Sequence, residues 1–232
     1  MKQLPLPIAL PPAPSFDNYL AQVNDAALAH LNHLRTLSAP VYLWGPRGSG
    51  KTHLLRALAL RWVHEGLRCA WFDAAAPLPW VLPEDARLVV VDDCEQLDAE
   101  GQQRAFALFE LAAAQGAQWA AAGAWPPVDM PLRDDLRTRL GWGHVFALHP
   151  PLEHETRAAL RREADRRGVF LSDEVMSYLL TRFERNLSHL MALLDRLDTY
   201  ALAEKRVVTV PLLKQMLREA AHSPGLHDEV AP

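Results

Sequence analysis

The sequence is poor in cysteine, in long apolar runs and in surplus positive charge, and each absence excludes a class of protein. Two cysteines in 232 residues, Cys69 and Cys94, cannot form a disulfide framework and lack metal-ligand spacing, so we expect small buried side chains in a reducing compartment. No apolar run approaches the roughly 20 residues that span a bilayer. The net charge of −4 gives no overall field that would draw the chain onto nucleic acid.

The first fifteen residues also lack a helix-compatible stretch, because proline recurs through them. The prolines of this stretch are Pro5, Pro7, Pro11, Pro12 and Pro14. They exclude the helical segment of a secretory signal and predict an extended tail over residues 1–12. We therefore expect a cytoplasmic protein that does not enter a membrane.

Strand and helix patterns alternate through the next part of the chain. Strands are expected at 41–44, 67–73, 88–91, 118–122 and 145–148, and helices at 24–37, 51–65 and 102–115. This alternation predicts an α/β domain over residues 13–150, with a parallel five-stranded sheet covered on both faces.

Only helical periodicity follows, at about 153–167, 172–183, 186–204 and 210–220. It predicts a small all-α lid domain over residues 151–220, followed by a disordered tail at 221–232. The arginines of the first of these helices alternate with Glu163 and Asp165, which indicates a solvated face rather than a DNA-binding surface.

A phosphate-binding loop is predicted between the first expected strand and its helix. The eight residues that fit the P-loop pattern are Gly45, Pro46, Arg47, Gly48, Ser49, Gly50, Lys51 and Thr52. Glycines let backbone N–H groups turn toward phosphate oxygens, and the helix N-terminus adds partial positive charge. Lys51 is expected to reach the outer phosphates, and the Thr52 hydroxyl to ligate Mg²⁺.

Two carboxylates end the expected strand at 88–91. In P-loop proteins such a strand lies beside the loop, so Asp92 is predicted to hold Mg²⁺ together with Thr52. Asp93 is predicted to polarise a water molecule near the terminal phosphate. ATP or ADP with Mg²⁺ is the expected ligand.

Three further segments resemble the Hda family of DnaA-related AAA+ proteins. Residues 16–19 (FDNY) resemble the start of the AAA+ region of the replication initiator DnaA, and Asp92-Asp93 resembles its second nucleotide motif. Residues 135–143 (DLRTRLGWG) resemble the arginine-finger segment of Hda. The resemblance covers nearly the whole chain, which also ends where Hda sequences end, before the DNA-reading domain of DnaA.

The resemblance implies a regulator of replication initiation with two partners. Residues 3–7 (QLPLP) resemble the peptide with which Hda-type proteins bind the DNA polymerase III beta sliding clamp, so Gln3, Leu4, Leu6 and Pro7 are the expected clamp-binding residues. Arg139 aligns with the trans arginine finger that promotes hydrolysis of DnaA-bound ATP and so prevents re-initiation. No direct sequence-specific DNA binding is implied, and a homo-oligomer is left open.

Other interpretations of these residues stay open at this stage. Arg139 could instead be a surface arginine paired with Asp134 or Asp135. The chain could also be a self-sufficient AAA+ ATPase such as a helicase loader, or an adaptor without a catalytic contribution. Ala122, Gly123 and Ser188 occupy positions where ATP-hydrolysing relatives carry polar or basic sensor residues, which argues for weak or absent intrinsic ATPase activity.

Overall fold

A parallel sheet of five strands forms the centre of the first part of the chain. The computed structural model describes residues 13–20, 22–183 and 187–222, which divide into two compact units between Pro151 and Leu152. The strands of the first unit, here called the α/β unit, are β1 (Val41–Trp44), β2 (Arg68–Phe72), β3 (Ala86–Val91), β4 (Gln118–Gly123) and β5 (His144–Ala147). The expected five-stranded parallel sheet is confirmed.

The strands lie in the order β2-β3-β4-β1-β5, and every neighbouring pair is parallel. Because parallel strands share one carboxyl edge, the segments that follow β1, β3 and β4 meet along the same side of the sheet. Ligands of open parallel sheets bind outside this edge. The P-loop, Asp92 and Gly123 therefore belong to one region.

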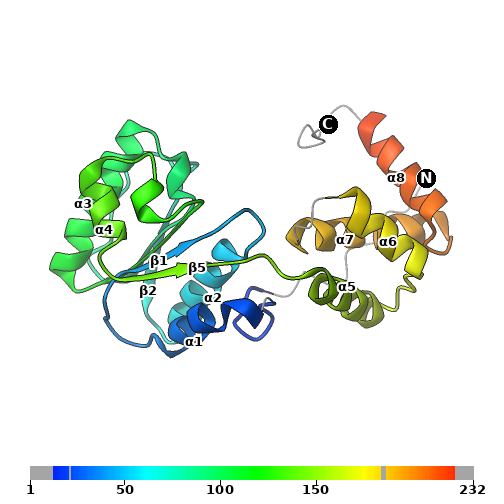
Figure 1. The fold of residues 1–232 in the computed structure, drawn as a ribbon, viewed down its shortest axis with the longest axis horizontal. Helices are drawn as coiled ribbons and strands as arrows, with labels where there is room; N and C mark the ends of the chain where they lie inside the picture. Colours follow the sequence, from blue (N-terminus) through cyan, green and yellow to red (C-terminus); the bar gives the residue numbers. More distant parts are fainter. Residues whose placement is uncertain (1–12, 21, 184–186, 223–232) are drawn as a thin grey trace. The chain divides into compact units, whose positions relative to one another are not determined.

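Helices cover both faces of this sheet (Figure 1). The helices of the α/β unit are α1 (Asp25–His33), α2 (Lys51–His64), α3 (Ala99–Gln115) and α4 (Asp134–Leu140), with short 3₁₀ helices η1 (Gln22–Asn24), η2 (Cys94–Gln96) and η3 (Pro127–Asp129). Alternate residues of each strand face opposite cores: Leu43 packs toward α1 and α2, whereas Tyr42 packs toward α3 and α4. In the second half of β4 the side chains are small, and Ala120, Ala121 and Ala122 are fully buried between the two helical layers.

The ends of two helices differ from the sequence expectation. α1 ends at His33 rather than near residue 37, because Leu34 adopts an extended conformation and is buried. The Leu34 carbonyl then accepts hydrogen bonds from Arg61 (2.7 Å) and Trp62 (3.2 Å) of α2. α3 begins three residues earlier than expected, because Asp98 caps it by accepting from the Gly101 N–H at 2.8 Å.

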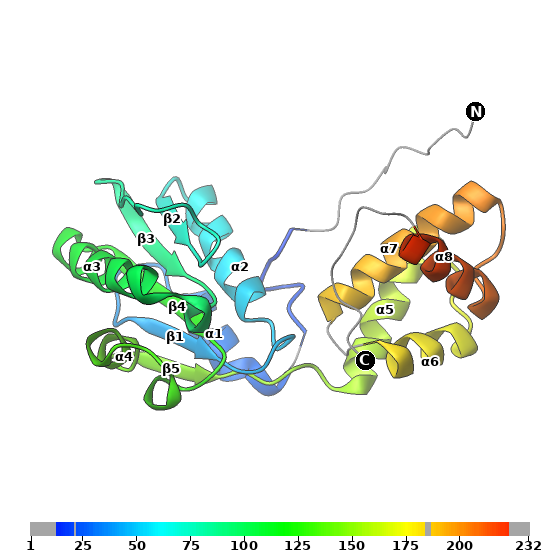
Figure 2. The same cartoon turned by 90° about the horizontal axis from the view of Figure 1, so that it is seen from above.

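The second unit, here called the lid unit, consists of helices (Figure 2). They are α5 (Glu153–Arg167), α6 (Asp173–Arg182), α7 (Leu187–Glu204) and α8 (Val210–His222). Ser172 caps α6 by accepting from the Val175 N–H at 3.3 Å, as its position predicts. Leucine, valine and methionine side chains from all four helices form one core, and each fully buried Leu or Val contributes about 1.5–3 kcal/mol to folding.

The expectation of a solvated face on α5 is wrong for Arg167. Its side chain is only 9% exposed and lies between Glu163 and Asp195, each at 2.6 Å. Arg166, in contrast, is half exposed and pairs with Glu163 at 2.7 Å. The reason is that Arg167 faces α7, so its guanidinium is a cross-link between two lid helices.

Two further findings bear on the class of protein. In the described ranges, no helix combines the length and apolarity that a membrane crossing requires. The same residues contain no group of three or more histidine, cysteine or acidic side chains placed to hold a metal ion.

Candidate nucleotide-binding site

The P-loop connects β1 to α2 in the conformation that phosphate binding requires. Gly48 and Gly50 have φ values of +82° and +90°, which side-chain-bearing residues rarely adopt. A Cβ on Gly50 would come within 2.5 Å of the Tyr19 ring, and one on Gly45 would collide with the Leu148 carbonyl. Backbone conformation therefore favours glycine at Gly48, and close neighbours add to this requirement at Gly45 and Gly50.

Polar groups inside the loop fit a phosphate chain. The Lys51 ammonium is buried and donates to the Gly45 carbonyl at 2.7 Å. The Ser49 hydroxyl is also buried and has no protein partner. An ammonium and an orphaned hydroxyl beside the N-terminus of α2 form a donor set suited to phosphate oxygens.

Asp92 follows β3 and contacts the P-loop helix. Its carboxylate is 3% exposed and accepts hydrogen bonds from the Thr52 side chain and from the Asp93 N–H, the latter at 3.0 Å. Burial raises the pKa of Asp92 despite the opposing hydrogen bond from Thr52. The structure thus brings Thr52 and Asp92 together, and a hydroxyl beside a carboxylate fits a Mg²⁺ ion. Asp93 adopts the left-handed region, with φ +49°, and is the N-cap residue of η2.

The end of β4 carries polar groups that the sequence analysis missed. Gly123 has no side chain, but the Tyr42 hydroxyl occupies the space where its Cβ would lie. The Glu95 carboxylate, from η2, accepts a hydrogen bond from the Ala124 N–H at 3.0 Å. Because the Gly123 carbonyl also accepts from the Gly45 N–H at 3.3 Å, these groups adjoin the P-loop. No spacing rule predicts them, since Tyr42 reaches this point from β1 and Glu95 from η2.

A second missed group joins the N-terminal segment to the P-loop. The Tyr19 hydroxyl donates to the Ser49 carbonyl at 2.9 Å and accepts from the Asn24 amide at 2.7 Å. The same amide group of Asn24 exchanges two hydrogen bonds with the backbone of His149, at 2.8 and 2.9 Å. A hydrogen-bonded chain therefore runs from the phosphate loop to the segment that precedes the lid unit.

The candidate finger, Arg139, lies at the surface on α4. Its side chain is 27% exposed, and its guanidinium pairs with Glu110 of α3 at 3.1 Å. It also lies 4.4 Å from the centre of the Trp142 ring. The alternative pairing of Arg139 with Asp134 or Asp135 is wrong: Asp134 binds Arg137 instead, and Asp135 binds Arg133, both at 2.7 Å. The difference arises because the side chain of Arg139 extends toward α3, away from the first turn of its own helix.

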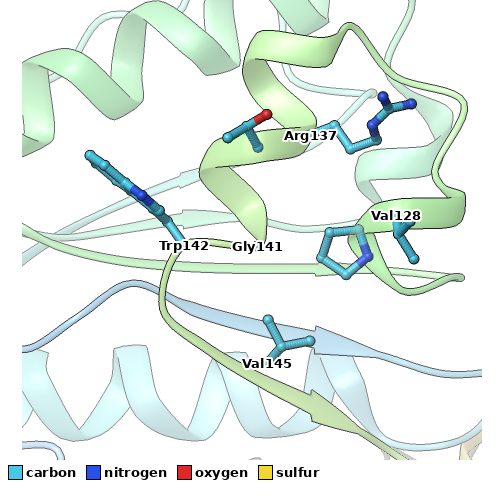
Figure 3. Close-up of a pocket in the computed structure, with 7 residues that line it drawn as sticks. Val128, Arg137, Gly141, Trp142 and Val145 are labelled. Atoms are coloured by element: carbon cyan, nitrogen blue, oxygen red, sulfur yellow. The ribbon is translucent and has the colours of Figure 1, made fainter.

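Arg137 lines a surface hollow beside α4, and Trp142 forms part of its rim. In Figure 3, Arg137 and Trp142 extend to opposite sides of the helix, with Val145 of β5 below them. The apolar rim includes Val128, which is 74% exposed, and Trp142, which is 66% exposed. The two arginines of α4 thus lie in different environments.

Two groups of predicted residues fall outside this description. Gln3, Leu4, Leu6 and Pro7 precede the described residues, and nothing in the structure bears on them. Ser188 lies in α7, and its side chain likewise falls outside the described set. The clamp-binding and second sensor assignments remain predictions.

A P-loop after β1, a carboxylate pair after β3 and a helical lid unit define an AAA+ nucleotide-binding fold. The protein is similar to domain III of the DnaA replication initiation protein of Thermotoga maritima, with a TM-score of 0.72 and 21% identity over 91% of this chain and 98% of that one. It is also similar to AMPPCP-bound DnaA of Aquifex aeolicus, with a TM-score of 0.66 and 19% identity over 91% and 71% of the two chains.

The sequence comparisons are more specific about the family. The model of the Hda lid domain matches residues 153–217. An uncharacterized protein of Haemophilus influenzae is 32% identical over 93% of this chain and 98% of its own length. The chain belongs to the Hda/DnaA-related family of AAA+ proteins, which confirms the resemblance found in the sequence.

Proposed function

We propose that this protein restrains replication initiation by promoting hydrolysis of ATP bound to DnaA, while its N-terminal peptide binds the sliding clamp. One observation supports the proposal: α4 carries Arg139 near the surface of an AAA+ unit, where its guanidinium pairs with the exposed Glu110 and lies beside Trp142. In nucleotide hydrolases, an arginine delivered by a neighbour neutralises charge that develops during phosphoryl transfer, with effects on the order of 10³–10⁵ in rate.

The protein's own P-loop is proposed to bind ATP or ADP with Mg²⁺. Lys51 and the backbone N–H groups of the loop would hold the phosphates, and Thr52 with Asp92 would hold the ion. Bound Mg²⁺ would neutralise phosphate charge. Asp93 is the proposed residue that polarises water. A solved structure of DnaA from Aquifex aeolicus is AMPPCP-bound, which supports a nucleotide ligand for this fold.

The clamp contact is proposed from the sequence of residues 3–7. Leu4, Leu6 and Pro7 offer apolar groups to a pocket, and the Gln3 amide offers hydrogen bonds. Docking on a clamp that encircles DNA would raise the local concentration of the α/β unit near newly copied DNA.

The decisive experiment measures hydrolysis of DnaA-bound ATP with and without the clamp loaded on DNA. We expect Arg139→Ala to abolish stimulation, and Arg137→Ala to retain it. Arg137 is the matched control because it lies on the same helix and carries the same charge, but pairs with Asp134 rather than with Glu110. Retained stimulation by Arg139→Ala would leave only an adaptor role.

A self-sufficient ATPase remains a second candidate because of Glu95. Its carboxylate reaches the end of β4, where ATP-hydrolysing relatives place a polar side chain. This reading requires ATP turnover by the isolated protein that is lost in both Lys51→Ala and Glu95→Gln. Phosphate release at the level of a buffer blank would exclude it.

A further inference from the structure

Arg139 is folded back onto its own chain rather than directed into solvent. Its guanidinium carbon lies 4.4 Å from the Trp142 ring centre, 5.7 Å from that of Phe109 and 6.0 Å from that of Phe106. These distances are within the range of cation–π attraction. Together with the Glu110 carboxylate, they form a cradle on α3 and after α4 that leaves only 27% of the side chain exposed.

The cradle and a nucleotide phosphate would compete for the same guanidinium. A finger must present its N–H donors to phosphate oxygens of another subunit. In the structure one of these nitrogens contacts Glu110 at 3.1 Å. A carboxylate that stayed so close to the guanidinium would also approach the phosphates and repel them.

We propose that Glu110 is a positioning residue that retains Arg139 in this cradle until the phosphates of the partner's nucleotide displace it. The inference rests on the proposed function of Arg139 as a finger. Glu110 is 52% exposed, so its attraction for Arg139 is screened by water and can be overcome. Retention by Glu110 lowers the fraction of molecules whose finger is available, and so raises the concentration needed for stimulation.

The test compares Glu110→Gln with wild type over a range of protein concentrations, measuring hydrolysis of DnaA-bound ATP with loaded clamp. Exposed ion pairs shift such equilibria by about two- to five-fold. We expect the half-maximal concentration to fall by that factor, with the saturating rate unchanged. Glu110→Asp, which keeps the charge on a shorter side chain, should lie between the two.

Glu100→Gln is the matched control. Glu100 lies on the same helix and pairs with Arg104 at 3.7 Å, with 58% of its side chain exposed. It should behave as wild type. Equal curves of hydrolysis rate against protein concentration for Glu110→Gln and Glu100→Gln would overturn the inference. A lower saturating rate for Glu110→Gln would also overturn it, because it would mean that the carboxylate supports the finger during hydrolysis.

A measurement without DnaA separates this inference from the proposed function. In ¹⁵N-arginine NMR spectra of the isolated protein, the Arg139 Nε–H signal is identified by its loss in Arg139→Lys. We expect it to move in Glu110→Gln and to stay in place in Glu100→Gln. Stimulation of hydrolysis by Arg139→Ala would refute the finger function of Arg139. An unmoved Nε–H signal would refute only the proposal that Glu110 retains Arg139.

Discussion

The Tyr42 hydroxyl lies against Gly123, the last residue of β4, beside the P-loop. It occupies the space that a Cβ at position 123 would need. Burial raises the pKa of Tyr42, so the hydroxyl stays protonated and donates to the Trp125 carbonyl at 3.0 Å. The position at which relatives place a sensor side chain is thus filled from the neighbouring strand.

Gly123→Ala should therefore destabilise the α/β unit by about 1–3 kcal/mol, the usual cost of overpacking. Adding Tyr42→Phe should recover part of that loss, since removal of the hydroxyl makes room for the new methyl group. Urea unfolding of the two single variants and the double variant measures the coupling. Strictly additive effects would show that the two groups do not compete for space.

Asp92→Asn should raise the melting temperature of the nucleotide-free protein by a few degrees. Burial disfavours the charged form of Asp92, and an amide of the same shape removes that charge. The same change should abolish Mg²⁺-dependent strengthening of nucleotide binding, measured by fluorescent ADP titration with and without Mg²⁺. A lower melting temperature would mean that the carboxylate is a net stabilising group.

His30 should make stability fall as the solution becomes acidic. Burial and the neighbouring His144, whose ring centre is 4.2 Å away, lower the pKa of His30 below 6.5. Between pH 6.5 and this lower pKa, the unfolded chain binds more protons than the folded protein does. The contribution of His30 to folding stability is therefore complete above pH 6.5 and declines as the pH falls below it. The drop in melting temperature from pH 7.5 to pH 5.5 should be smaller in His30→Phe than in wild type. His33→Phe, on the same helix, is the control.

Arg167→Met should destabilise the lid unit by about 3 kcal/mol, because it leaves the largely buried Glu163 without one of its two cationic partners. Arg166→Met removes the exposed partner and should cost no more than about 1 kcal/mol. The arginines hold the pKa of Glu163 at about 2. The contribution of Glu163 to folding stability is therefore complete above pH 4.5, its ordinary pKa, and is lost as the pH falls through about 2. Thermal unfolding of both variants at neutral pH makes the comparison.

Replacing Leu4 and Leu6 together by alanine should abolish clamp binding, because both leucines are proposed to fill the apolar pocket of the clamp. Pull-down by clamp loaded on DNA measures the loss, and an unchanged melting temperature shows that the fold is intact. Replacing Ile8 by alanine, just beyond the proposed peptide, is the control. Undiminished capture of the double variant would refute the assignment.

The sequence predicted the fold well because its signals are local. Two short apolar runs predict strands: Val41–Trp44, which the P-loop follows, and Val89–Asp93, which ends in two carboxylates. The strands and the P-loop edge can therefore be recognised from residues that are neighbours in the chain. The α1 terminus was misjudged because Leu34 is fixed by Arg61 and Trp62, which are contacts made only in the folded protein.

The parts of the site that were missed depend on distant residues. Tyr42, Glu95 and Tyr19 reach the P-loop edge from β1, η2 and the segment before η1, and nothing in their spacing indicates that they meet. Arg139 was identified by resemblance, but its partner Glu110 lies on a separate helix. Side-chain placement across elements is where sequence patterns carry least information.

The paired hydrogen bonds between Asn24 and His149 have a consequence for engineering. They join the residue that precedes α1 to the segment that follows β5, so the two ends of the chain segment 24–149 lie next to each other. Adjacent ends favour circular permutation and domain grafting. A short linker should therefore be able to join residues 24 and 149 in an α/β unit made without the lid unit, with new ends opened in an exposed loop.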